Sequence, residues 1–222
     1  MPKTGPILPG EKPINSVKPV ETEVKPRVIK EVAGLVSVTD IDNSLFIDLK
    51  YSTADNFTGK VIYPVTVCLL QKETAQKLMK ANTEFKEKGY KLKIWDAYRP
   101  VYVQKIFWDI VKDSRFVANP AMGGSIHNRG TAVDLTLLDS YGDELKMPSK
   151  FDDFSANAYR NNSKMDSEAR KNMNYLTDVM KRNGFKTIDT EWWHFEDSNS
   201  SEYKIVDVKL DEFLKKESLP LN

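Results

Sequence analysis

Residues 123–138 read GGSIHNRGTAVDLTLL, and the rest of the chain is best understood from this stretch. Residues 132–138 place three apolar side chains at alternate positions, Val133, Leu135 and Leu137. This alternation predicts a strand with one buried face, so Asp134 should point to the opposite side. The preceding loop carries His127, one of only two histidines in the chain; the other is His194. The two histidines and Asp134 are the first candidates for a functional site.

These residues, together with Glu191, have the composition of an open metal site. Two imidazoles and a carboxylate suit catalytic zinc, and three ligands leave a fourth position for water. His127, Asp134 and His194 would be the ligands, and Glu191 would be the base that takes a proton from the water. Each residue alone also has a structural explanation, because a lone histidine is usually a hydrogen-bonded core residue. Glu191 and His194 would even point to opposite faces of a regular strand, so the site requires a bulge or twist between them.

Length and charge limit the classes of function. A chain of 222 residues suits one globular domain with a sizeable core. With 33 basic and 32 acidic residues it offers no charged field for nucleic acid or an anionic membrane, so we expect small or neutral partners. The single cysteine, Cys68, excludes an internal disulfide framework and a cysteine-based zinc site, and its apolar neighbours predict that it is buried. No apolar run is long enough for a membrane helix. The oligomeric state is left open.

The amino-terminal residues 1–34 differ in composition from the rest. They hold six of the eleven prolines and almost no aromatic side chain, which is typical of an extended, disordered linker. The globular domain, which carries the candidate zinc site, should then occupy residues 35–222. A tether of this kind suggests that Met1 need not be the natural start, with an upstream export signal or lipid anchor and a place in the cell envelope. A disordered tail on an enzyme of the bacterial cytoplasm explains the segment nearly as well.

The pattern of hydrophobic residues predicts a single α+β domain, in which helices flank an antiparallel sheet. The predicted strands cover residues 45–51, 91–95, 132–138 and 185–195. The predicted helices cover residues 71–88, a segment that starts at Pro100, and a segment capped by Asp166 or Ser167. Residues 148–165 should form a long surface loop, and the tail from Tyr203 could add a closing helix.

Several motifs together resemble one known family. Ser125-x-His127-x-x-Gly130-x-Ala132-x-Asp134, followed by Glu191-Trp192-Trp193-His194, resembles the zinc-site pattern of the VanX-type D-alanyl-D-alanine dipeptidases, within the wider group of zinc D-Ala-D-Ala peptidases. The similarity also takes in residues 51–59, the segment WDAYRP at 95–100, and Phe151-Asp152, and it covers about residues 45–195. It implies the D-Ala-D-Ala peptidase/hedgehog-like zinc fold.

The resemblance also implies a role for each matching position. His127, Asp134 and His194 match the zinc ligands, Glu191 the general base, and Arg99 the arginine that stabilises the oxyanion of the tetrahedral intermediate. Asp152 and Ser125 match positions that hold the free amine of the dipeptide, and Tyr51 matches one that lines the pocket. For the amine, Asp153 is an alternative to Asp152, and Ser125 could instead cap the loop before His127.

From the residues and the resemblance we expect a zinc-dependent enzyme that hydrolyses the D-alanyl-D-alanine dipeptide, a cell-wall precursor. One alternative is a D,D-carboxypeptidase or endopeptidase that acts on peptidoglycan stem peptides with the same metal site. The other is a non-catalytic, zinc-stabilised wall-binding module, against which Glu191 and Arg99 argue because a binding protein has no need of them.

Overall fold

A computed structural model describes residues 29–214. The helices are α1 (Val38–Ile41), α2 (Lys72–Lys86), α3 (Val101–Val111), α4 (Ser167–Arg182) and α5 (Leu210–Leu214). The strands are β1 (Glu31–Val32), β2 (Leu35–Ser37), β3 (Phe46–Ile47), β4 (Leu69–Gln71), β5 (Lys91–Asp96), β6 (Ala132–Leu138), β7 (Phe185–Thr187) and β8 (His194–Asp197). No helix of this described part is both long and apolar enough to cross a bilayer.

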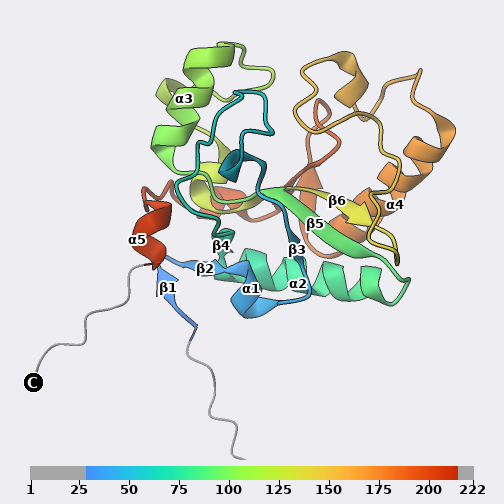
Figure 1. Cartoon of the computed structure of the whole chain (residues 1–222), viewed down its shortest axis with the longest axis horizontal. Coiled ribbons are helices and arrows are strands. Elements are labelled where there is room, and N and C mark those ends of the chain that lie inside the picture. The colour runs from blue at the N-terminus through green and yellow to red at the C-terminus, as the bar shows by residue number, and fades with distance from the viewer. Residues whose placement is uncertain (1–28, 215–222) are drawn as a thin grey trace, which may run out of the picture.

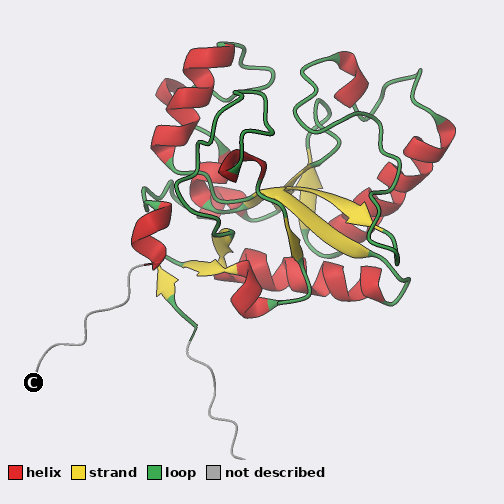
Figure 2. Cartoon of the chain, in the orientation of Figure 1, coloured by secondary structure: helices red, strands yellow, loops and turns green. Residues whose placement is uncertain are grey.

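The strands form two sheets, which are drawn in yellow in Figure 2. The larger sheet has the order β3-β5-β6-β8-β7 and is antiparallel except for the edge pair β3–β5. The smaller sheet is antiparallel, with the order β1-β2-β4. Helix α2 runs beneath the larger sheet, whereas α3 and the long loops rise above it (Figure 1). The expected α+β class is therefore confirmed.

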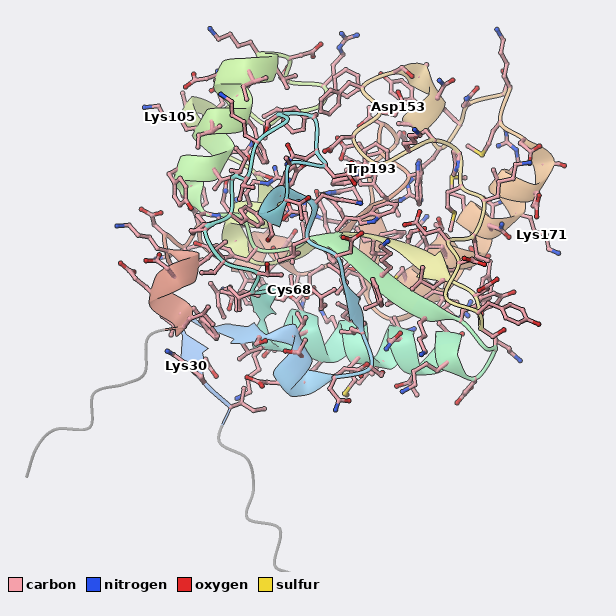
Figure 3. The ribbon with its side chains drawn as sticks, in the orientation of Figure 1. Lys30, Cys68, Lys105, Asp153, Lys171 and Trp193 are labelled. Carbon is pink, nitrogen blue, oxygen red and sulfur yellow. The ribbon has the colours of Figure 1, made fainter. Side chains whose placement is uncertain are left out.

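The core is one cluster of buried apolar side chains, to which both sheets and helices α2, α3, α4 and α5 contribute. Helix α2 buries one side of its surface and packs against both β5 and α4. Helix α4 begins as expected, because the side chain of Asp166 accepts hydrogen bonds from the backbone N–H groups of Glu168 and Ala169. Cys68 is buried, as its sequence neighbours predicted, and lies in the interior (Figure 3).

The termini of the domain differ from the expected boundaries. Residues 1–28 of the expected linker lie outside the described residues, but Glu31–Val32 form β1, which pairs with β2. The folded part of the chain thus includes the end of the segment that composition assigned to the linker. At the other end, the expected closing helix is the short α5, which buries Leu210 and Phe213.

Two predicted strands are wrong in detail. Of the strand predicted at residues 45–51, only Phe46–Ile47 form β3, and Lys50–Ser52 form a 3₁₀ turn. The strand predicted at 185–195 is really two strands, β7 and β8, joined by a loop at residues 188–193. This interruption shapes the site.

Candidate metal centre and substrate pocket

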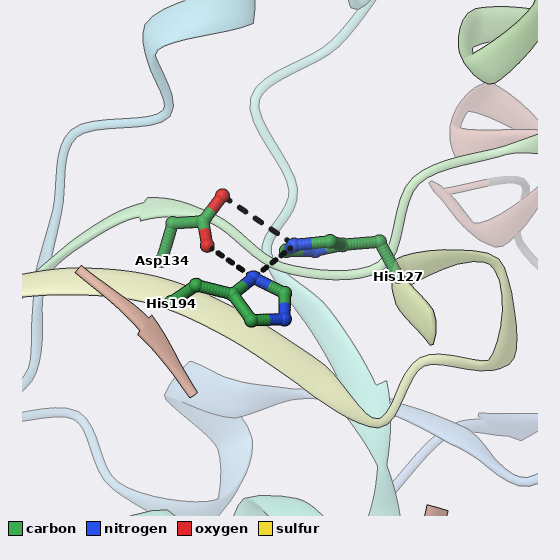
Figure 4. A group of neighbouring side chains, drawn as sticks. All are labelled: His127, Asp134 and His194. Atoms are coloured by element: carbon green, nitrogen blue, oxygen red, sulfur yellow. Dashed lines mark hydrogen bonds and ion pairs between the residues drawn. The ribbon is translucent and has the colours of Figure 1, made fainter. Parts of the chain in front are cut away.

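His127, Asp134 and His194 converge above the larger sheet, as Figure 4 shows. One ligand atom from each residue lies within 4.8 Å of the others. His194 Nδ1 is 2.9 Å from Asp134 Oδ1 and 3.2 Å from His127 Nε2, and His127 Nε2 is 3.4 Å from Asp134 Oδ2. All three residues are buried. The structure therefore brings together the three residues that the sequence singled out as ligands.

Strand register explains this convergence. Asp134 on β6 and His194 on β8 are direct cross-strand partners, so their side chains leave the sheet on the same face. His127 comes from the 3₁₀ turn Ile126–Arg129, just before β6. This turn ends at Gly130, where φ is +71° and an added Cβ would collide with Leu35. Glycine thus allows the histidine loop to lie against the smaller sheet.

In each imidazole, the ring nitrogen that points away from the cluster makes a hydrogen bond. His127 Nδ1 lies 2.7 Å from the carbonyl oxygen of Ala97, so it must donate, and His127 Nε2 turns a lone pair to the centre. His194 Nε2 lies 3.3 Å from Glu196 Oε1 and donates there, which leaves His194 Nδ1 as its inner atom. Two lone pairs and a carboxylate that face one point are the donor set that a divalent metal ion prefers. The residues present therefore fit a metal.

Sequence reasoning missed Glu196. The sequence does contain a signal for it: residues two apart on a strand share a face, and Glu196 follows His194 by two, so its side chain should lie beside that of His194. The strand that the sequence predicts ends at Phe195 and therefore leaves Glu196 out.

The pKa values of Asp134 and His194 are strongly shifted by their contacts within the cluster. Burial alone would raise the pKa of Asp134, but the two histidines hold it far below its usual value. Burial would likewise lower the pKa of His194, yet Asp134 and Glu196 raise it to about 10. A metal ion at this centre would compete with protons for the same ligand atoms.

Glu191 reaches the same centre because the chain is not a regular strand there. Residues 192 and 193 form a turn, and Glu191 Oε2 lies 3.9 Å from His194 Nδ1. The irregularity that the sequence required is therefore present. Burial raises the pKa of Glu191 to about 7, although the positive charges of His194 and Arg99 oppose the shift. A carboxylate with a pKa near neutrality is suited to accept and return a proton.

Arg99 lies between β5 and α3 with its guanidinium buried. Its Nε and one terminal nitrogen donate to Asp96 Oδ2 at 3.0 and 2.6 Å, and the other terminal nitrogen donates to Gln104 Oε1 at 2.9 Å. These bonds use three of the five N–H donors of arginine, so two remain. The guanidinium also lies 4.0 Å from Asp134 Oδ2. Arg99 is thus a fixed cation beside the candidate metal centre, with two N–H donors that these bonds do not use.

A cavity of about 190 Å³ opens beside these residues. Its lining includes all eight residues that the sequence nominated: Tyr51, Arg99, Ser125, His127, Asp134, Asp152, Glu191 and His194. Trp193 and Glu196 also line it. Trp193 is labelled in Figure 3 among the loops above the sheet. One small cavity thus collects residues from five separate stretches of the chain.

Asp152 and Tyr51 form one wall of this cavity. The Tyr51 hydroxyl lies 3.1 Å from both carboxylate oxygens of Asp152. Asp152 has φ of +57°, which is strained for a residue other than glycine and is often found at functional positions. Burial and the charge of Asp134 raise the pKa of Asp152 well above its usual value. Asp153, the alternative, is not among the lining residues.

Ser125 lines the cavity and also caps the 3₁₀ turn of His127. Its Oγ accepts a hydrogen bond from the backbone N–H of His127 at 3.2 Å, and Asn128 completes a capping box. The capping role that the sequence left open is therefore present. Accepting this bond leaves the hydroxyl hydrogen of Ser125 available to be donated.

Comparison with known proteins gives one consistent family. A family model described as D-ala-D-ala dipeptidase matches residues 31–215. The D-alanyl-D-alanine dipeptidase of Escherichia coli K12 is 36% identical over 178 residues, which cover 80% of this chain and 92% of that protein. The D-alanyl-D-alanine dipeptidase of Enterococcus faecium is 31% identical over 183 residues, which cover 73% of this chain and 90% of that protein.

Solved structures give weaker similarities. The LD-carboxypeptidase LdcB is 20% identical, with a TM-score of 0.41, and the match covers 83% of this chain and 78% of that chain. The vancomycin resistance D,D-pentapeptidase VanY, solved in complex with Zn(II), is 15% identical, with a TM-score of 0.39, over 69% of this chain and 88% of that chain. Because both TM-scores are below 0.5, the family assignment rests on the similarity in sequence and not on these structures.

Proposed function

The chain belongs to the D-Ala-D-Ala dipeptidase family, and on this basis we propose that it hydrolyses D-alanyl-D-alanine at a zinc centre formed by His127, Asp134 and His194. The observation that carries the proposal is the meeting of these three side chains with Glu191 and Arg99 at one small cavity. The donor set and the outward hydrogen bonds of both histidines support zinc. A zinc ion there would supply Lewis acidity, which lowers the pKa of a water molecule and polarises a carbonyl oxygen.

In this proposal each residue of the site has a separate role in hydrolysis. Glu191 takes a proton from the attacking water as its oxygen adds to the peptide carbonyl carbon. Arg99, whose bonds to Asp96 and Gln104 leave two N–H donors unused, would stabilise the negative charge that develops on the carbonyl oxygen. When the C–N bond breaks, Glu191 passes the proton to the leaving amine, so two D-alanine molecules form. Asp96 and Gln104 hold the guanidinium of Arg99 in place throughout.

The size of the cavity favours a dipeptide over a stem peptide. Pockets for drug-sized ligands enclose roughly 300–1,000 Å³, whereas this one encloses about 190 Å³. A second cavity, of about 690 Å³, shares Phe57 and Asp152 with the first. Asp152 therefore lies at the boundary between the two cavities. We assign Asp152 and Ser125 to binding of the free amine, and Tyr51, whose hydroxyl lies 3.1 Å from the Asp152 carboxylate oxygens, to the lining of the pocket.

This assignment predicts that N-acetyl-D-Ala-D-Ala is not cleaved. Acetylation removes the positive charge that Asp152 would bind and leaves the carboxylate without a partner. The measurement is D-alanine release from the acetylated and the free dipeptide under the same conditions. Cleavage of both at similar rates would remove Asp152 from its role and favour a peptidase with an open groove.

Arg99→Ala should lower kcat on the order of a hundredfold or more, because a fixed cation at the oxyanion is lost. The substitution also leaves Asp96 buried without its cation, and breaking such a pair costs about 3–5 kcal/mol of unfolding free energy. Arg99→Lys keeps the charge but not the planar fork, so it should retain more stability and only part of the rate. Equal kcat for wild type and a folded Arg99→Ala variant would contradict the role.

A further inference from the structure

The loop between β7 and β8, residues 188–193, has to turn Glu191 and His194 toward one point. Strand β7 ends at Thr187, which pairs with Phe195. The carbonyl groups of Trp192 and His194 therefore extend beyond the reach of β7. Buried carbonyl groups without a strand partner need another donor. Arg160, from the loop between β6 and α4 at the upper right of Figure 1, provides it.

Arg160 donates to three carbonyl oxygens of this segment. Its Nε donates to Ile188 at 2.9 Å, and one terminal nitrogen donates to Trp192 at 2.7 Å and to His194 at 3.1 Å. The other terminal nitrogen donates to Thr177 Oγ1 on α4 at 2.8 Å. The rigid, planar guanidinium thus fixes both ends of the segment relative to a helix of the core.

Further contacts link the same two loops. The backbone N–H of Arg160 donates to the carbonyl of Asp189 at 2.9 Å, and that of Trp192 donates to the carbonyl of Ala158 at 3.1 Å. The guanidinium carbon of Arg160 also lies 4.9 Å from the centre of the Phe195 ring. These contacts all lie on the segment that carries Glu191 and His194, and Arg160 is not among the residues that line the cavity.

We propose that Arg160 is the positioning residue that holds Glu191 and His194 in the geometry required for metal binding and proton transfer. The inference rests on the proposed function, because it assigns Arg160 a task at that same site. Arg160 donates hydrogen bonds to the carbonyl groups of Trp192 and His194, which a longer β7 would otherwise bind. These bonds permit the turn at residues 192–193. A lysine has a single nitrogen and cannot reach all three carbonyls from one place.

The test compares Arg160→Ala and Arg160→Lys with Arg170→Ala as a matched control. Arg170 donates to the carbonyl of Asn162 at 2.5 Å, so it supports the same loop through a hydrogen bond that does not involve residues 188–194. For each protein we would measure zinc affinity by competition with a chromogenic chelator, the melting temperature without metal, and kcat and KM on D-Ala-D-Ala. Activity of Arg160→Ala would also be measured with added guanidinium ion.

Loss of a residue that orients a metal ligand typically weakens metal affinity on the order of tenfold to a hundredfold. We expect this loss for both Arg160 variants, a fall in kcat with KM little changed, and recovery of kcat in Arg160→Ala on addition of guanidinium. Arg170→Ala should keep the zinc affinity of the wild type. Wild-type zinc affinity and kcat in the Arg160 variants, or an equal loss in Arg170→Ala, would overturn the inference. If the wild type left D-Ala-D-Ala intact, the proposed function would fail, whereas the zinc affinities would still decide the role of Arg160.

Discussion

Replacing Glu191 by glutamine should lower kcat for D-Ala-D-Ala on the order of 10²–10⁴-fold, the range that a general base contributes. Glutamine keeps the shape of the side chain but cannot accept a proton from water. Glu191 is not one of the three ligands, so zinc affinity should be close to that of the wild type. The measurements are kcat and the zinc content of the purified variant. A folded, zinc-loaded Glu191→Gln protein with a rate within tenfold of the wild type would exclude Glu191 as the base.

Glu196→Gln is the matched control for this experiment. Glu196 lines the same cavity, but its carboxylate accepts from His194 Nε2. Its loss should therefore weaken zinc binding by about tenfold to a hundredfold, and excess zinc should restore the rate. Excess zinc should leave Glu191→Gln unchanged. The two neighbouring glutamates thus have distinct signatures, one in proton transfer and the other in metal affinity.

Asp134→Asn should abolish the thermal stabilisation that zinc gives the wild type. A ligand at about a thousandfold above its Kd stabilises the folded state by about 4 kcal/mol. At roughly 2–4 °C per kcal/mol for a domain of this size, zinc should raise the wild-type melting temperature by about 8–16 °C. Asparagine has a similar shape but no negative charge, and Asp134 lies between both histidines. The variant should show little shift and no measurable turnover.

Asp152→Asn provides the comparison, because Asp152 lines the cavity without being one of the three ligands. It should keep the zinc-dependent shift and lose substrate affinity instead. A full thermal shift in Asp134→Asn would show that the metal is bound elsewhere.

The sequence was informative wherever local pattern decides the structure. The alternation in residues 132–138 predicted that Asp134 would face away from Val133 and Leu135, and β6 presents it to the cavity. The resemblance nominated His127 and His194, and the register of β6 and β8 explains why distant segments meet.

Contacts between distant segments were beyond local pattern. The bend between Glu191 and His194 depends on Arg160, about thirty residues earlier, and nothing near Glu191 in the sequence encodes it. Gln104 was missed for a similar reason: in the sequence it is one polar residue of a helix, but in the fold it is buried against Arg99. The periodicity of hydrophobic residues predicts which side chains share a face of a helix, but it does not predict which other segment packs against that face.

The most direct test of the account is D-alanine release by the zinc-loaded protein from D-Ala-D-Ala, with a stem pentapeptide that ends in D-Ala-D-Ala run alongside. The cavity of about 190 Å³ and the assignment of Asp152 to the free amine predict release from the dipeptide alone. Release from the pentapeptide at a similar or higher rate would identify a carboxypeptidase and contradict the assignment of Asp152. Release from neither substrate would contradict the catalytic account and leave a zinc-stabilised binding module.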